Sequence, residues 1–173
     1  MMLTGSEADR IYTALVTFLK FLMLLALVAW IGGIVFFGAV VAPTVFMVLP
    51  THDLAGKVVS RSLWILHYIG IVSGVIYLIC SMVLSYRLRG TPEPFALRHL
   101  AIVLMLAVTI IGHEAVAKPM LRLRDDMGVI DTVPPNDPRR VEFNRMHVWS
   151  TRIEETVLVL GLGVLWGTAR RLS

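Results

Sequence analysis

The chain has 173 residues, of which 57% are hydrophobic and 16% charged, and its formal net charge is +4. A soluble domain carries about 25% charged residues, and one of this length cannot bury so large an apolar fraction, so lipid must be the solvent for part of the chain. The positive charge does not indicate nucleic-acid binding, because the basic residues flank apolar runs and form no stripe on a polar domain. The single cysteine, Cys80, excludes an internal disulfide.

In chain order, four runs without Asp, Glu, Lys or Arg alternate with charged segments: residues 21–51, 62–86, 99–113 and 156–169. A spanning helix needs about 20 mostly apolar residues. The first two runs are long enough, and the last two reach that length only by including polar residues at one end. We therefore predict an all-α integral membrane four-helix bundle, a single domain over residues 1–173, with spans at about 20–43, 62–86, 98–118 and 148–169.

Helix signals refine these boundaries. Pro43 and Pro119 should kink or end the first and third helices. The second helix should begin near residue 52 and the fourth near residue 138, so both should extend beyond the membrane, with a loop over 128–136. In each half a helix meets a proline and the next helix enters near a histidine. This repetition suggests a duplicated helical hairpin.

Four spans place both termini on one side of the membrane. The short segments on that side concentrate five arginines: Arg87, Arg89, Arg98, Arg170 and Arg171. Basic residues in short loops mark the cytoplasmic side. We therefore predict a multi-pass protein of the cell membrane with cytoplasmic termini and the lipid bilayer as its partner.

Small residues at four-residue spacing allow helices to approach closely in membranes. Such positions occur in the first, second and fourth helices, at Gly32, Gly33, Gly70, Gly74, Gly163 and Gly167. The simplest interpretation is packing within the bundle. The alternative is that one of these faces forms the seam of a homodimer.

Ionisable and polar residues gather where the third helix ends and the fourth begins. Because adjacent antiparallel helices place these groups at similar depth, we expect one polar cluster, made of His67, His113, Glu114, Lys118, His147, Ser150, Thr151, Arg152, Glu154 and Glu155. Pairing Glu114 with Arg152, or Lys118 with Glu155, would offset the cost of burying charge. The cluster is either a functional pocket or a structural network that sets helix register.

A metal ion is a further hypothesis for the cluster. Its candidate ligands are His67, His113, His147 and Glu154, and imidazole with carboxylate suits Zn(II) or Fe(II), whereas nearby methionines suit Cu(I). The stretch beginning at His113 is not HExxH, so the spacing is weak support. Haem would require two facing histidines, for which only His67 and His147 serve. No nucleophile–base pair and no glycine-rich phosphate loop is recognisable, which favours a protein that is not an enzyme.

Four motifs resemble one known family. They are "WIGGIVFFGAVVAPTVF" at 30–46, "AGKV" at 55–58, "KPML" at 118–121 and "FNRMHVWSTRIE" at 143–154. Together they resemble the family typified by transmembrane protein 205, a domain of unknown function. That family often has Asn where this chain has Glu154. It is distantly similar to the CopD copper-resistance and HemJ-type four-helix membrane proteins, which implies metal or haem chemistry only by analogy.

Three functions follow as alternatives. The first is a membrane protein with a polar intramembrane pocket that handles a small ligand or metal ion. The second is a structural or partner-binding membrane subunit, and the third is a haem-dependent membrane redox enzyme. The HemJ-type enzymes place a histidine in their first span, and the first span here has none, so the resemblance does not carry their activity to this chain.

Overall fold

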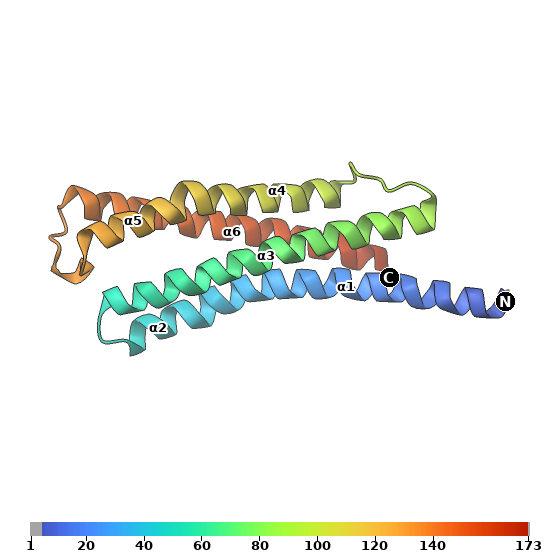
Figure 1. The fold of residues 1–173 in the computed structure, drawn as a ribbon, viewed down its shortest axis with the longest axis horizontal. Helices are drawn as coiled ribbons and strands as arrows, with labels where there is room; N and C mark the ends of the chain where they lie inside the picture. The colour runs from blue at the N-terminus through green and yellow to red at the C-terminus, as the bar shows by residue number, and fades with distance from the viewer. Residues whose placement is uncertain (1–4, 173) are drawn as a thin grey trace.

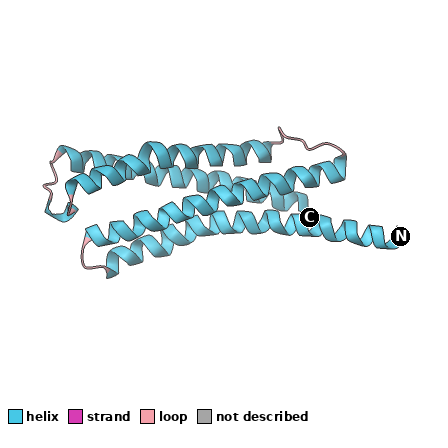
Figure 2. Ribbon diagram, in the orientation of Figure 1, coloured by secondary structure: helices cyan, strands magenta, loops and turns pink. Residues whose placement is uncertain are grey.

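A computed structural model describes residues 5–172, with the last two of these as backbone only. Figures 1 and 2 show an all-α protein in which four long helical segments pack side by side as a bundle, so the predicted fold class is confirmed. The elements in chain order are α1 (Gly5–Phe36), η1 (Phe37–Val41), α2 (Ala42–Val48), α3 (His52–Arg89), α4 (Leu97–Gly112), η2 (His113–Ala117), α5 (Lys118–Met127), η3 (Ile130–Thr132) and α6 (Pro138–Leu172).

Local sequence explains where the helices begin and end. The Thr51 hydroxyl accepts a hydrogen bond from the Leu54 amide at 3.2 Å and caps α3. Gly90, at φ 76°, ends α3 in the left-handed conformation that glycine adopts without strain, and Gly128, at φ 68°, ends α5. Asp137 precedes α6, and its carboxylate accepts from the Arg139 amide at 2.8 Å. The predicted starts of the second and fourth helices are thus confirmed.

The segments form an up-and-down bundle. α1 packs along α3, α4 packs along α6, and further contacts join α3 to α4 and α1 to α6. In Figure 1 the two described ends of the chain lie toward the end of the bundle where α3 connects to α4. The α2–α3 and α5–α6 connections lie at the opposite end. The described ends of the chain therefore lie toward one end of the bundle, as four antiparallel segments require.

Glycines of α3 admit a tryptophan into the bundle core. Trp30 is buried, and a Cβ atom on Gly70 would lie 2.4 Å from its Nε1. A Cβ on Gly74 would lie 2.8 Å from Trp30 Cζ3, and one on Gly33 would lie 2.7 Å from Leu66 Cδ1. Since real Cβ atoms essentially never approach so closely, Gly70 and Gly74 need to be glycine for packing against the Trp30 ring, whereas at Gly33 the close atom is the flexible end of the Leu66 side chain.

The other glycines singled out from the sequence do not pack against the bundle. A Cβ atom on Gly32, Gly163 or Gly167 would meet nothing within 4 Å. In α6 the closely packed glycine is Gly161, where a Cβ would lie 2.9 Å from Ile31 Cγ1. Residues 163 and 167 lie on other faces of the helix, because each residue advances the helix by about 100°.

Both proline-containing helices continue past the proline through a wider turn. The π-helical turn η1 precedes Pro43, and η2 precedes Pro119, with each proline second in the following helix. Proline lacks an amide hydrogen and crowds the preceding turn, and a π-turn accommodates the resulting gap in the hydrogen-bond ladder. The two hairpins therefore share the same irregularity at corresponding places.

Three helical stretches are long and apolar enough to cross a membrane: Gly5–Val48, His52–Arg89 and Leu97–Met127. Within the described residues α6 does not join them. Its apolar run is bounded by Glu154, Glu155 and Arg170 and is too short by itself. The fourth span stays a prediction, and it requires that the polar residues of α6 face the interior of the protein.

Candidate functional site

A cavity of about 850 Å³ lies at the end of the bundle that holds the α2–α3 and α5–α6 connections. The two hairpins diverge toward this end in Figure 1. All four helical segments contribute to its wall, which is mostly apolar, and both π-turns take part, η1 through Phe37 and η2 through His113. Four of the five histidines line it: His52, His67, His113 and His147.

A largely buried imidazole–carboxylate pair is the polar centre of this wall. His67 Nε2 lies 2.5 Å from Glu154 Oε1, and the two side chains are 8% and 17% exposed. An ionised carboxylate only accepts, so His67 donates through Nε2. On its other side His67 Nδ1 lies 3.4 Å from His113 Nδ1, with the two rings edge to face. A neutral His67 then accepts at Nδ1 from the N–H of His113. α3, η2 and α6 meet through these three side chains.

α6 contributes further polar residues to the cavity wall, and His52, Ser60, Arg124 and Asp131 add others from α3, α5 and η3. Ser150 is half-buried, whereas His147, Thr151 and Glu155 are exposed. The Thr151 hydroxyl donates to the His147 carbonyl at 3.1 Å, so it is satisfied within its own helix. These residues and Glu154 recur at three- and four-residue spacing, which places them along the face of α6 that lines the cavity.

The predicted ion pairs between helices are wrong. Lys118 Nζ donates to Glu114 Oε1 at 2.6 Å within one helical turn, so Glu114 does not pair with Arg152, nor Lys118 with Glu155. Glu114, Lys118 and Arg152 are exposed and do not line the cavity. The reason is helical rotation. His113 and Ala117 face the cavity, and the next residue along in each case is turned by about 100° toward the outside.

The metal and haem hypotheses do not fit this donor geometry. Among residues 5–172, no three His, Cys, Asp or Glu side chains converge in a way that could hold a metal ion. His113 and Glu154 approach opposite nitrogens of the His67 ring, so they cannot share one ion with it. A haem iron needs a free imidazole nitrogen, and both nitrogens of His67 already have partners. The described residues therefore show no preformed metal centre at this cavity.

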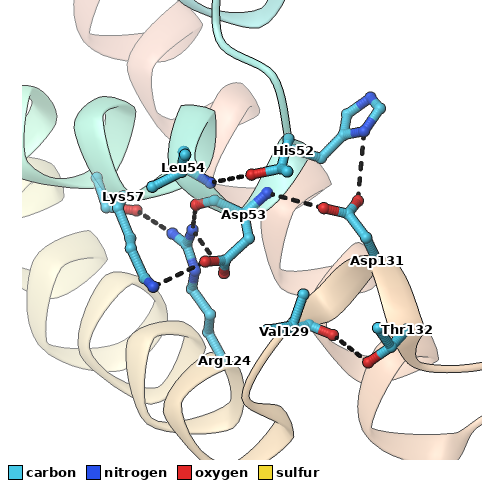
Figure 3. A network of polar contacts seen from close by, with 10 residues as sticks. His52, Asp53, Leu54, Lys57, Arg124, Val129, Asp131 and Thr132 are labelled. Carbon is cyan, nitrogen blue, oxygen red and sulfur yellow. Dashed lines mark hydrogen bonds and ion pairs between the residues drawn. The ribbon is translucent and has the colours of Figure 1, made fainter.

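A second polar network, which the sequence analysis did not predict, lies beside the cavity at the same end of the bundle (Figure 3). Arg124 is buried and donates to the backbone oxygen of Asp53. The Asp53 carboxylate lies 2.7 Å from Lys57 Nζ and 3.4 Å from Arg124 Nη2, and the Asp53 amide donates to Asp131 at 3.2 Å. This network ties α3 to α5 and to the connection before α6. Sequence spacing shows only the Asp53–Lys57 pair, since the other partners lie 71 and 78 residues away.

Comparison with known proteins places the chain in a family. Residues 25–128, more than half of the chain, match the family described as Domain of unknown function (DUF4149), and this stretch includes α3, α4 and the His67–His113 contact. No curated protein and no solved structure matches the chain. The chain therefore belongs to the DUF4149 family.

Proposed function

We propose that this chain is a four-span membrane protein of the transmembrane protein 205 type that binds a small, mostly apolar organic ligand in the cavity between its two hairpins. The observation that carries the proposal is the cavity of about 850 Å³ with the buried His67–Glu154 pair in an apolar wall. Ligand pockets in proteins measure roughly 300–1,000 Å³ and combine apolar lining with a few fixed polar groups. A polar group on the ligand would bond to the outer oxygen of Glu154 or to His147.

Exposed aromatic side chains support a bilayer position for this pocket. On α3, Trp64 and Tyr68 stack with their ring centroids 6.3 Å apart, and the Arg61 guanidinium lies 4.8 Å from the Trp64 ring. Tyr86, exposed on the same helix, follows Trp64 by 22 residues, or roughly 33 Å. Interfacial aromatics separated by about 30 Å match the hydrocarbon thickness of a bilayer. His67 is then just inside the hydrocarbon boundary.

The same placement makes α6 the fourth span. Trp149 and Trp166 are exposed on α6 and are 17 residues apart, which corresponds to roughly 26 Å. Between them Glu154 faces the cavity and bonds to His67. A ligand reaching the cavity from the bilayer would therefore meet the polar, cavity-lining face at the start of this span, which explains why α6 enters the membrane with ionisable residues.

The orientation of the bundle in the membrane follows from the arginines at one of its ends. Arg87, Arg89, Arg98 and Arg170 lie at the end of the bundle that carries the termini. We infer that this end is cytoplasmic and that the cavity opens toward the opposite face. Reporter fusions after residue 173 and within residues 128–136 test this orientation. A cytoplasmic signal from the 128–136 fusion would reverse it.

Binding is tested with the fluorescent aromatic amine 1-aminoanthracene and the detergent-solubilised protein. Trp64 lines the cavity, so bound probe should quench tryptophan emission by saturable energy transfer. Ala117→Leu should abolish saturation, because Ala117 lines the cavity and a larger side chain would fill it. Glu154→Gln should weaken binding about tenfold, the worth of one hydrogen bond to a charged group. Arg152→Gln is the matched control outside the cavity and should bind as the native protein does.

The same test distinguishes ligand binding from the alternative that the chain is a structural subunit. If Glu154→Gln lowers the melting temperature but leaves a saturable probe signal unchanged, the His67–Glu154 pair sets helix register and does not recognise ligand. If quenching rises without saturation in all four proteins, the probe only partitions into detergent and the cavity proposal is wrong.

A further inference from the structure

A second, smaller pocket of about 120 Å³ lies at the end of the bundle opposite the cavity. α1, α3, α4 and α6 all contribute to it. Its polar lining consists of three cations and three hydroxyl groups, from Lys20, Arg89, Arg98, Ser81, Ser85 and Thr168. No acidic side chain lines it. This combination of cations and hydroxyl donors suits a tetrahedral oxyanion.

The Arg98 guanidinium is held rigidly in the wall of this pocket. Its Nε donates to Ser81 Oγ at 2.9 Å, and its Nη2 donates to Ser85 Oγ at 2.6 Å. Its Nη1 is buried and makes no hydrogen bond within the described chain. The side chain is 14% exposed. Two neutral hydroxyls orient the guanidinium, and the carboxylate that faces it, Glu93, reaches its Nη2 only at 3.4 Å, so the positive charge is weakly balanced, which is costly in a dry environment.

A buried histidine orients one of these hydroxyls. His99 is buried, its Nδ1 lies 2.9 Å from the Glu93 carbonyl oxygen, and its Nε2 lies 2.7 Å from Ser81 Oγ. The carbonyl only accepts, so Nδ1 carries a proton. The Nε2 of a neutral imidazole then accepts a hydrogen bond from the Ser81 hydroxyl. The lone pairs of the Ser81 oxygen therefore remain to accept from Arg98. His99 thus fixes the Ser81 hydroxyl without adding charge to the pocket.

The local carboxylate does not balance the three cations. Glu93 Oε1 lies 2.5 Å from Arg89 Nη1, whereas its other oxygen reaches Arg98 Nη2 only at 3.4 Å. The hydrogen bond from Arg89 is the main cause of the lowered pKa of Glu93, so this carboxylate is already used. Lys20 has no ion pair with any residue from 5 to 170. The pocket therefore keeps a net positive charge that an anion would neutralise.

Aromatic side chains place this pocket at headgroup depth. Trp166 is exposed two residues before Thr168, and the Arg170 guanidinium lies 5.0 Å from its ring. Tyr86, next to Ser85, is also exposed. Trp and Tyr beside Arg are typical of the membrane interface, where lipid phosphates lie. Basic pockets between membrane helices at this level bind anionic headgroups.

We propose that this pocket binds a phosphate group, supplied by the headgroup of an anionic phospholipid. Arg98, Lys20 and the Ser85 hydroxyl hold the phosphate oxygens, and the acyl chains lie along the apolar surface of the bundle. Free phosphate offers the same oxygens without the chains. The site lies at the other end of the molecule from the ligand cavity and does not depend on it.

The test uses full-length protein in nanodiscs of phosphatidylcholine, with and without one-fifth phosphatidylglycerol. A separate arm adds inorganic phosphate to the phosphatidylcholine discs against chloride at equal ionic strength. Native protein should melt at a higher temperature with phosphatidylglycerol and should not respond to inorganic phosphate. Lys20→Gln should lose most of the shift, with lipid affinity by native mass spectrometry about tenfold weaker, as expected for one charge-assisted hydrogen bond.

Arg87→Gln is the matched control, because Arg87 lies at the same end, is exposed and does not line the pocket. It should keep the shift of the native protein. If Arg87→Gln and Lys20→Gln lose the shift equally, the effect is general electrostatics and the site is wrong. If Lys20→Gln keeps the full shift, or if no protein responds to phosphatidylglycerol, the proposal also fails. If the melting temperature rises with inorganic phosphate but not with phosphatidylglycerol, the ligand is a soluble anion and the lipid proposal is wrong. Should Lys20→Gln not fold, Lys20→Arg should retain the shift and Lys20→Met should lose it.

Discussion

Replacing Gly70 by alanine tests the packing at the centre of the bundle most directly. The new Cβ would lie 2.4, 2.7 and 2.9 Å from three atoms of the Trp30 ring, which is only 2% exposed. The Trp30 ring is rigid and packed on several sides, so it cannot move away from the new methyl group as the end of a flexible side chain could. Overpacking of this kind costs about 1–3 kcal/mol, and the gain in helix propensity from glycine to alanine is about 1 kcal/mol. With three close approaches the upper half of that range applies, so the net loss should be about 1–2 kcal/mol.

Gly163→Ala is the matched control in the same kind of helix. Its Cβ would meet nothing within 4 Å, so only the propensity gain of about 0.5–1 kcal/mol remains. The two substitutions should therefore change stability in opposite directions. The assay is unfolding of the detergent-solubilised protein followed by tryptophan fluorescence. For a chain of this size Gly70→Ala should lower the melting temperature by roughly 2–8 °C.

Two results would contradict this reasoning. If Gly70→Ala is as stable as the native protein, Trp30 does not pack rigidly against α3. If Gly163→Ala destabilises the protein and the loss depends on protein concentration, the outer face of α6 is a seam between two copies. A double variant that also carries Trp30→Phe should recover part of the Gly70→Ala loss, because a smaller ring leaves room for the methyl group.

Three further substitutions have defined outcomes. Arg124→Met should lower the melting temperature more than Lys57→Met does, because Arg124 is buried and leaves a backbone oxygen of α3 without its donor, whereas Lys57 is exposed. Tyr77→Phe should cost about 1 kcal/mol in the same unfolding assay, since the fully buried hydroxyl bonds to α6 at 2.7 Å. Asp137→Asn should be less stable than the native protein at pH 7. The pKa of Asp137 is lowered from 3.8 to about 2, so its contribution is present above about pH 4, declines as the pH falls toward 2, and is fully lost only below about pH 2, where the two melting curves should coincide.

The order and ends of the helices could be predicted from the sequence because their causes are local. The cap at Thr51, the glycine at 128 and the prolines at 43 and 119 act within one or two turns of the backbone. The prolines also marked the irregular turns, although their π-helical form depends on how the chain continues beyond them. Counting residues also placed His67, His113 and His147 at one end of the bundle, since depth along a helix follows from residue number.

Which way each side chain points around its helix axis was decided by the tertiary structure. Counting residues placed Glu114 and Arg152 at similar depth, but one residue of rotation separates His113, which faces the cavity, from Glu114, which pairs with Lys118 outside. An apolar helix in a membrane has no polar face to reveal which side is inward, so the pattern alone cannot resolve that rotation.

Contacts between residues far apart in the sequence were likewise decided only by the tertiary structure. Composition and the apolar runs by themselves determined that the chain is a helical membrane bundle, because lipid accepts few other structures. Arg124 meets Asp53, and Arg98 meets Ser81, only after the hairpins pack and bring separate segments together. Gly161 rather than Gly163 receives the neighbouring helix for the same reason. Which groups face one another is a property of the packed interface, where close approach and buried charge are satisfied together.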